Sequence, residues 1–349
     1  MTAPDMADSQ VPVGIAGMGI YMPPQVVTAE MLAGETGIAA DILRDKFGVR
    51  QVHRAGPECH VSDMATAAGR AALDDADVSP EDVDLVVSCG SEYKDYIVWS
   101  AAANVLHRLG CSRAQAFEVY ALCAGMPVTL RIVGDMMRAE PEIETALIVA
   151  ASKESALVDR RNQRTRFMFN FGDGAAAAVL RRGSHRNVLL ASSSKVDGAL
   201  NEDAIVPAGG SREPASAATV AGGKHLLDVP DLNHMRSRLG EVSGDNFLEV
   251  IQSALQRSGR DRVDFLASVH MKRSMQDWLV SATGARGTFY LEEYGHMQAA
   301  DQIVALVEAR RRGLLHRGDT VVLAAAGVGY TWAASVIAWG VMGHKSWAI

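Results

Sequence analysis

Residues 117–127 have the sequence Phe117-Glu118-Val119-Tyr120-Ala121-Leu122-Cys123-Ala124-Gly125-Met126-Pro127. Residues 117–122 are apolar or favour β-structure apart from Glu118, and residues 128–137 carry apolar side chains at helical spacing. This pattern predicts a strand that ends at a cysteine and a helix that follows at once. Pro127 suits the first turn of such a helix because its missing N–H costs little there. Cys123 then lies where free backbone N–H groups and the positive end of the helix dipole favour a thiolate, the form of cysteine that attacks carbonyl carbon.

The composition is typical of a globular enzyme. The chain has 349 residues, enough for two domains, and 48% of them are hydrophobic and 21% charged. The net charge of -7 argues against a general nucleic-acid or anionic-membrane partner. The cysteines show neither a CxxC pair nor metal-ligand spacing, so we expect no metal site. Residues 1–10 do not resemble a signal peptide, and no apolar stretch could span a bilayer. We therefore expect a cytoplasmic protein with a disordered tail at residues 1–10.

Helical and apolar strand patterns alternate along the rest of the chain. Strands are expected at residues 11–21, 83–88, 146–151, 175–180, 263–270, 321–326 and 333–339, and helices at 29–46, 61–75, 100–109, 245–257, 275–284 and 299–312. This alternation predicts an α/β fold with mostly parallel sheets. The glycine turn at 172–174 has a counterpart at 327–329, which indicates an internal duplication. We interpret residues 184–224 as a connecting segment and loop between two halves, residues 11–183 and 225–349.

Four motifs occur together in a characteristic order. They are Ala121-Leu122-Cys123-Ala124-Gly125, Phe171-Gly172-Asp173-Gly174, Tyr294-Gly295-His296 and Gly327-Val328-Gly329-Tyr330-Thr331-Trp332. Through these motifs the chain resembles the thiolase-superfamily condensing enzymes of the β-ketoacyl-acyl-carrier-protein synthase III type. The resemblance implies a thiolase-like fold, in which two pseudo-duplicated halves form a five-layered α-β-α-β-α core, and a homodimer. It implies no permanently bound cofactor, because the substrate is an acyl thioester of coenzyme A or of acyl carrier protein.

The resemblance also implies roles for individual residues. Cys123 accepts the acyl group, His270 assists it, and the backbone N–H groups of Cys123 and Val328 form the oxyanion hole. The family's third catalytic position, usually asparagine, is His296 here, and two histidines serve that purpose in the related synthases I and II. Without the resemblance, both histidines would be interpreted as structural residues with satisfied hydrogen bonds. Asp173 is expected to bond backbone amides and to hold its loop beside the nucleophile.

A further correspondence concerns the loop at residues 91–96. Glu92 matches the catalytic glutamate of the related hydroxymethylglutaryl-CoA synthases, which predicts a general acid or base beside the thioester. The alternative is a polar loop in which Glu92, Lys94 and Asp95 form ion pairs that contribute little.

Substrate contacts are the part of the pattern that departs most from the family. At the positions of the tryptophan and arginine that clasp the adenine in bacterial synthases III, this chain has Ile42 and Lys46. Lys46, Lys272 and Arg273 are the candidates for binding the carrier. Trp99, Phe167 and Phe169 are expected to line an acyl tunnel or the dimer contact, with plain core packing as the alternative. Tyr96 is a further candidate for the substrate pocket.

Three hypotheses of function follow. In the first, an acyl group is loaded onto Cys123 and passed to a carbon nucleophile in a Claisen-type condensation of fatty-acid, polyketide or specialised-metabolite biosynthesis. In the second, a hydroxyl or amine replaces the carbon nucleophile, so that an ester or amide forms. In the third, the chain is a catalytically silent partner subunit, which the presence of both Cys123 and His270 argues against.

Overall fold

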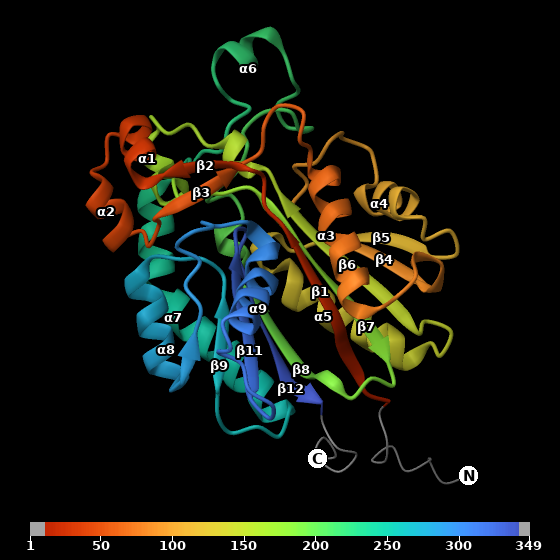
Figure 1. Cartoon of the computed structure of the whole chain (residues 1–349). Coiled ribbons are helices and arrows are strands. Elements are labelled where there is room, and N and C mark those ends of the chain that lie inside the picture. Colours follow the sequence, from red (N-terminus) through yellow and green to blue (C-terminus); the bar gives the residue numbers. More distant parts are fainter. Residues whose placement is uncertain (1–10, 342–349) are drawn as a thin grey trace.

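The structure is a computed structural model that describes residues 11–341. Its strands form a ten-stranded sheet and a separate pair (Figure 1). The strand order is β10-β9-β11-β12-β8-β1-β7-β6-β4-β5. One half holds β1 (Val13–Tyr21), β4 (Leu85–Gly90), β5 (Gln115–Tyr120), β6 (Thr145–Ser152) and β7 (Gly174–Arg182). The other half holds β8 (Arg186–Val196), β9 (Phe265–Ser268), β10 (Gly287–Thr288), β11 (Thr320–Gly327) and β12 (Thr331–Val341). The pair Gly14 and Val188, from β1 and β8, joins the halves.

The two halves of the sheet repeat one pairing pattern. In the first half β4 is parallel to β5 and β6, whereas β6–β7 and β7–β1 are antiparallel. In the second half β9 is parallel to β10 and β11, whereas β11–β12 and β12–β8 are antiparallel. The repeat supports the predicted duplication. The prediction of mostly parallel sheets is wrong, because a strand buried on both faces shows the same apolar run whichever way its neighbours point.

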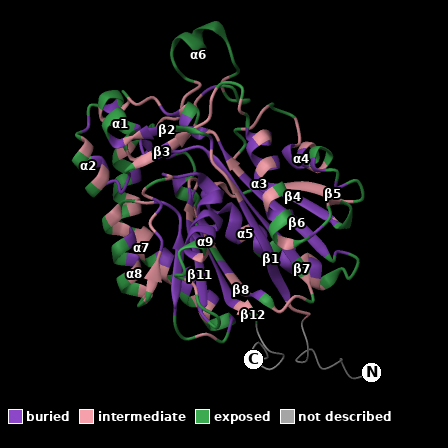
Figure 2. Cartoon of the chain, in the orientation of Figure 1, coloured by how far each residue is buried: buried purple, intermediate pink, exposed green. Residues whose placement is uncertain are grey.

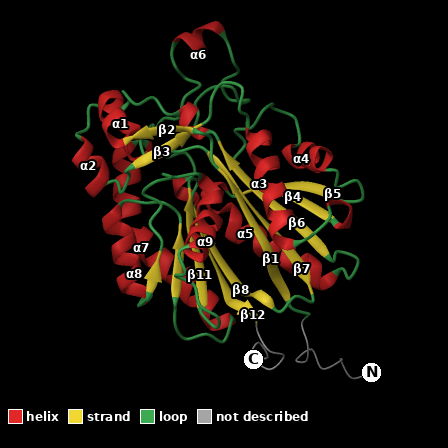
Figure 3. Ribbon diagram, viewed as in Figure 1, coloured by secondary structure: helices red, strands yellow, loops and turns green. Residues whose placement is uncertain are grey.

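Helices complete a five-layered arrangement (Figure 3). α3 (Val61–Ala76) and α4 (Ala101–Leu109) pack outside the first half of the sheet, and α7 (Leu232–Arg257), with α8 (Arg273–Thr283) beside it, packs outside the second half. α5 (Gly125–Ala139) and α9 (Asp301–Arg311) contact strands of both halves and form the central layer. α9 is buried from Asp301 to Ala309, as the colouring of Figure 2 shows. The predicted α-β-α-β-α core is therefore present, with the strongly buried helix α9 in its central layer.

Two parts of the chain differ from the sequence prediction. The single helix expected at residues 29–46 is divided into α1 (Ala29–Thr36) and α2 (Ala40–Asp45), because Gly37 takes a left-handed conformation with φ 70° and ends α1. The segment 184–224 begins with the long strand β8, whose run of three serines at 192–194 hides its strand pattern. The rest of that segment, with the short helix α6 (Ala217–Ala221), projects at the top of Figure 1.

A small second sheet and the chain ends complete the description. β2 (Gln25–Thr28) and β3 (Gln51–Arg54) form an antiparallel pair beside α1. The predicted disordered tail, residues 1–10, lies outside the described residues. Among the described residues, no helix combines the length and the apolar character that crossing a bilayer requires.

Candidate active site

Cys123 lies in a short 3-10 turn, Leu122–Ala124, that connects β5 to α5. The cysteine is buried, with 3% of its surface exposed. Leu122 has a φ of 49°, a left-handed conformation that costs a non-glycine residue about 1–3 kcal/mol. Gly125 begins α5 and allows β4 to approach closely, since a Cβ there would stand 3.0 Å from the backbone nitrogen of Gly90. This strained turn places the sulfur at the N-terminus of α5, as the sequence predicted, and the first turn of that helix is largely buried.

His296 is the histidine that faces Cys123. Its Nε2 lies 3.1 Å from Cys123 Sγ, and its Nδ1 lies 2.6 Å from Oδ2 of Asp301. All three residues are buried, and Asp301, the first residue of α9, has no exposed surface. Because a carboxylate accepts hydrogen bonds, the imidazole proton belongs on Nδ1, and Nε2 is free to accept the thiol proton. The three side chains therefore form a cysteine–histidine–aspartate triad.

The surroundings of His296 favour its protonated form. Burial by itself lowers the pKa of His296, but the carboxylate of Asp301 and the sulfur of Cys123 outweigh burial and hold the pKa well above the usual 6.5. The imidazole can therefore hold a proton taken from the thiol.

His270 follows β9 and is also buried, but its ring makes other contacts. Nδ1 lies 2.8 Å from Nδ2 of Asn170, and Nε2 lies 3.0 Å from the carbonyl oxygen of Gly48. An amide N–H donates and a carbonyl accepts, so these partners assign the proton of the ring to Nε2. Burial lowers the pKa of His270, which keeps the ring neutral. The hydrogen bonds of the Cys123 sulfur go instead to His296 and, at 3.6 Å, to a glutamine.

That glutamine, Gln298, and the turn at 327–329 form the remaining walls around the sulfur. Gln298 is buried and has a φ of 58°, a conformation that glutamine rarely adopts. Gly327 lies against the nucleophile, because a Cβ there would stand 2.7 Å from the carbonyl oxygen of Ala121 and 3.1 Å from the backbone nitrogen of Cys123. Only glycine lets this turn, with Val328 at its centre, approach so closely.

The loop that contains Asp173 makes backbone hydrogen bonds to His296. The carboxylate of Asp173 accepts hydrogen bonds from the backbone N–H of Ala55 at 2.8 Å and from the hydroxyl of Ser155 at 2.8 Å. Next to it, the backbone of residues 170–172 makes hydrogen bonds of 2.9 and 3.0 Å to the backbone of His296. Asp173 therefore fixes the loop that holds the base in place, which agrees with its predicted role.

Glu92 lies in the exposed segment between β4 and α4. Its side chain forms no hydrogen bond or ion pair with another described residue. Lys94 does not pair with it, because Lys94 Nζ lies 2.6 Å from Glu118 Oε2 and 2.7 Å from the hydroxyl of Tyr120. The geometry therefore brings Glu92 together with neither Cys123 nor a histidine.

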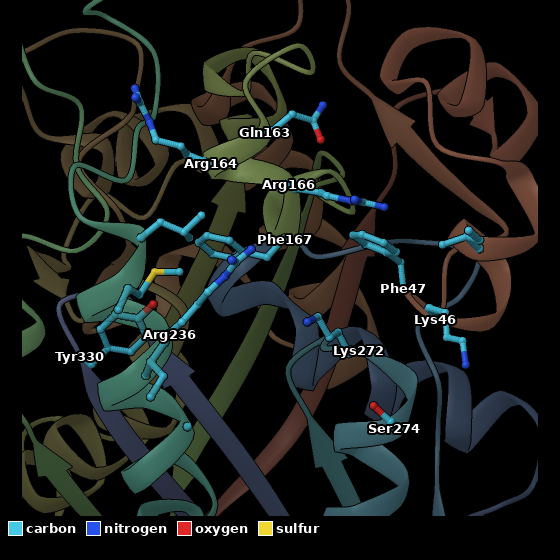
Figure 4. Close-up of a pocket in the computed structure, with 15 residues that line it drawn as sticks. Lys46, Phe47, Gln163, Arg164, Arg166, Phe167, Arg236, Lys272, Ser274 and Tyr330 are labelled. Atoms are coloured by element: carbon cyan, nitrogen blue, oxygen red, sulfur yellow. The ribbon is translucent and has the colours of Figure 1, made fainter.

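A cavity of about 720 Å³ lies between α7 and residues 163–167 (Figure 4). Its lining includes the predicted residues Lys46, Phe167 and Lys272. Tyr330 also lines it, and this residue ends the turn that begins at Gly327, which packs against the backbone of Cys123.

The other residues predicted to contact substrate lie elsewhere. Phe169 is fully buried in an apolar cluster beneath the cavity wall. Tyr96 and Trp99 pack edge to face in the exposed segment after β4, with ring centroids 5.7 Å apart. Arg273 forms ion pairs with Glu292 and with an aspartate of its own helix. None of these four residues lines the cavity.

The sequence of the chain matches that of known proteins. The family model for 3-oxoacyl-[acyl-carrier-protein] synthase III matches residues 117–198, and that for its C-terminal part matches residues 258–339. The beta-ketoacyl-[acyl-carrier-protein] synthase III of Desulfitobacterium hafniense is 31% identical over 332 residues, which cover 94% of this chain and 98% of the relative. The chain belongs to the β-ketoacyl-[acyl-carrier-protein] synthase III family.

Solved structures of synthase III agree with the fold. The enzyme of Pseudomonas aeruginosa PAO1 matches with a TM-score of 0.81 and 28% identity, over 95% of this chain and 100% of that one. The priming beta-ketosynthase of the R1128 polyketide pathway shares the fold, with a TM-score of 0.82 and 21% identity over 97% and 100% of the two chains. The thiolase-like fold is thus confirmed, and so is the prediction of a condensing acyltransferase of the β-ketoacyl synthase III type.

Three residues of this synthase III site were missed by sequence reasoning: Asn170, Gln298 and Asp301. An aspartate at the first position of a helix is favoured by the helix dipole alone, so Asp301 carries no functional signal in the sequence. Asn170 precedes the glycine motif by one residue, and only the folded chain shows that it contacts a histidine 100 residues away.

Proposed function

We propose that this chain transfers acyl groups through a thioester on Cys123. The observation that carries the proposal is the 3.1 Å contact between Cys123 Sγ and His296 Nε2, with Nδ1 of the same ring bonded to Asp301. His296 takes the thiol proton, the sulfur attacks the carbonyl carbon of an acyl thioester, and His296 returns the proton to the leaving thiol. The backbone N–H groups of Cys123 and Val328 are the proposed oxyanion hole. A covalent intermediate of this kind divides one difficult transfer into two easier ones.

The second half-reaction needs donors for the enolate oxygen of a malonyl thioester or a β-keto substrate. We assign this role to His270, because it is buried, neutral and protonated on Nε2. The substrate oxygen would accept this N–H in place of the carbonyl oxygen of Gly48. No contact within the described part of the chain supports a catalytic role for Glu92.

We propose that the donor is an acyl thioester of coenzyme A or of acyl carrier protein whose phosphate-bearing arm occupies the cavity. Four basic side chains line the cavity and form no ion pair with another described residue: Lys46, Arg166, Arg236 and Lys272. Uncompensated cations of this kind bind phosphate. Arg273 is a weaker candidate than predicted, because Glu292 already neutralises it. Among the described residues no group of three or more His, Cys, Asp or Glu could hold a metal ion, and the proposed reaction uses none.

We propose a homodimer assembled along β5. This strand ends the sheet and leaves one edge unpaired. The segment before α4 exposes Tyr96, Ile97 and Val98, whose exposed fractions are 68%, 85% and 103%. Apolar side chains gathered beside an open strand edge are typical of an interface. A cytoplasmic location belongs to the same proposal, supported by four cysteines that are all free.

The first test is the mass of the intact protein after incubation with acyl-CoA thioesters. Wild type should gain one acyl group and the Cys123→Ala variant none. Cys59→Ala is the matched control, because Cys59 is a free and more exposed thiol outside the site, and this variant should be acylated like the wild type. A wild-type protein that gains no acyl group from CoA or carrier-protein donors would refute the proposal.

Ester or amide formation is the second candidate. It is favoured by the His296–Asp301 pair, since a histidine held in this way can deprotonate a hydroxyl or amine. Labelled malonyl thioester distinguishes the two: condensation releases one carbon dioxide for each product, and transfer to a hydroxyl or amine releases none.

A further inference from the structure

Asp301 contacts both histidines of the site, His296 and His270. Its Oδ2 accepts hydrogen bonds from His296 Nδ1 at 2.6 Å and from the backbone N–H of His270 at 2.7 Å, and its Oδ1 accepts from the backbone N–H of Met297 at 2.7 Å. The carboxylate has no exposed surface, and its one ion-pair partner among the described residues is His296. A charge buried in this way is costly unless hydrogen bonds and an opposite charge compensate it.

We propose that Asp301 is a positioning residue for acyl transfer, which holds His296 with a proton on Nδ1 and turns the lone pair of Nε2 toward the Cys123 sulfur. This inference rests on the proposed function and deepens it. A neutral imidazole has one donor and one acceptor nitrogen, so a carboxylate at Nδ1 determines which nitrogen faces the sulfur. The asparagine usual at position 296 in the family has no basic nitrogen and needs no such partner.

The proton can be followed through the reaction. In the first half, the thiol proton moves to Nε2, the Cys123 sulfur bonds to the acyl carbon, and the bond from that carbon to the donor sulfur breaks. The proton then leaves on the donor thiol. His296 is neutral again, with Nε2 unprotonated beside the acyl group, so the second half-reaction begins with a base in place. Asp301 serves both halves because it stabilises the imidazolium whenever that ion forms.

Other titratable groups near His296 do not replace this carboxylate. They are Cys123 after β5 and His270 after β9, and Tyr330 before β12 lies near Cys123. His270 is neutral, and Tyr330 is a buried phenol whose pKa is raised, so neither carries a negative charge at neutral pH. Asp301 is therefore the permanent anion in contact with the imidazole.

The test replaces Asp301 by asparagine. The single amide oxygen of asparagine can take the place of Oδ1 and accept from the N–H of Met297. Its NH2 group then takes the place of Oδ2, offers an N–H to Nδ1 and so reverses the tautomer of His296, while the backbone N–H of His270 loses its acceptor. We expect acylation of Cys123, followed by rapid-quench mass spectrometry, to slow roughly 100-fold, as loss of a general base would. The pH at which His296 loses its proton, measured by ¹⁵N NMR, should move down, which a purely structural role of Asp301 would not cause.

A double-mutant cycle separates positioning from scaffolding. In the His296→Asn background, Asp301→Asn should change the acylation rate less than about twofold, because the residue through which it acts is absent. An equal loss in both backgrounds, or an unchanged titration of His296, would overturn the proposal. Should Asp301→Asn fold poorly, ¹⁵N NMR of wild type decides alone, since the proposal requires Nδ1 to be protonated after Cys123 is alkylated.

A failure of the proposed acyl transfer can be distinguished from a failure of the role proposed for Asp301. The same cycle can be run with iodoacetamide, which alkylates Cys123 without any acyl donor. A wild type that is alkylated but never acylated would refute the acyl-transfer proposal and leave the role of Asp301 measurable.

Discussion

Replacing His296 by asparagine restores the residue usual in the family and removes the proposed base. The asparagine side chain is shorter than histidine and its amide has no basic nitrogen to take the thiol proton, so the 3.1 Å contact with Cys123 is lost. General-base catalysis contributes about 10²–10⁴-fold, so acylation should slow by that factor, which corresponds to about 2.7–5.5 kcal/mol of transition-state stabilisation. Substrate affinity should stay unchanged, because the basic residues that line the cavity are untouched.

The same substitution should reduce stability. The carboxylate of Asp301 keeps its two backbone donors but loses the imidazole, and an incompletely paired buried group costs about 1–3 kcal/mol. Thermal unfolding should therefore begin at a lower temperature than in wild type. His316→Asn is the matched control, because His316 has a side chain that is 75% exposed and that lies 3.6 Å from its partner aspartate.

The assay is single-turnover acylation, quenched on the millisecond scale and read as intact-protein mass. A His296→Asn variant that is folded and acylates at the wild-type rate would refute the assignment of His296 as the base. A loss of equal size in His316→Asn would show that the effect is not local. A slow variant with an unchanged donor affinity would support the assignment.

Three further outcomes are expected. Gly327→Ala should lower both stability and acylation, as measured by thermal unfolding and intact mass, because its Cβ would stand 2.7 Å from a backbone oxygen beside the nucleophile; unaltered acylation would contradict the close packing of this turn. Lys272→Ala should raise the KM for acyl-CoA and weaken its dependence on salt, whereas Arg273→Ala, already paired with Glu292, should change KM less; the reverse order would contradict the assigned carrier site. Ile97→Asp should convert the proposed dimer to monomer in light scattering, and an unaltered mass would place the interface elsewhere.

Local patterns in the sequence were sufficient to predict the position of the nucleophile between a strand and a helix. The strand, cysteine and helix around Cys123, the glycine turn before β7 and the glycine turn after β11 all follow from residues close together in the chain. Strand direction could not be predicted in this way, because β6 and β7 are both continuous apolar runs, and such runs fit parallel and antiparallel neighbours equally. β8 was not predicted as a strand because its three consecutive serines break the apolar pattern. These serines pair with residues of β12, a strand that is distant in sequence.

The roles of the histidines depend on contacts that sequence spacing does not encode. His270 lies two residues beyond the end of β9, and the amide of Asn170 and the carbonyl of Gly48 occupy both nitrogens of its ring. Position 296 could be recognised as the family's third catalytic position, but its chemistry depends on an aspartate five residues later that only the turn into α9 brings to Nδ1.

Position 296 holds a histidine where the family usually has an asparagine. Asp301 explains how a histidine can act as a base at this position. A histidine buried at this depth would by itself be driven to the neutral form, since burial lowers its pKa, and either nitrogen could then face the sulfur. The carboxylate and the Cys123 sulfur together outweigh burial, and the carboxylate selects one tautomer. The same carboxylate accepts the backbone N–H of His270, so a single group fixes both histidines relative to Cys123. A substitution of Asp301 should therefore affect the protonation of His296 more than the position of His270. The ring of His270 is also held by Asn170 and Gly48.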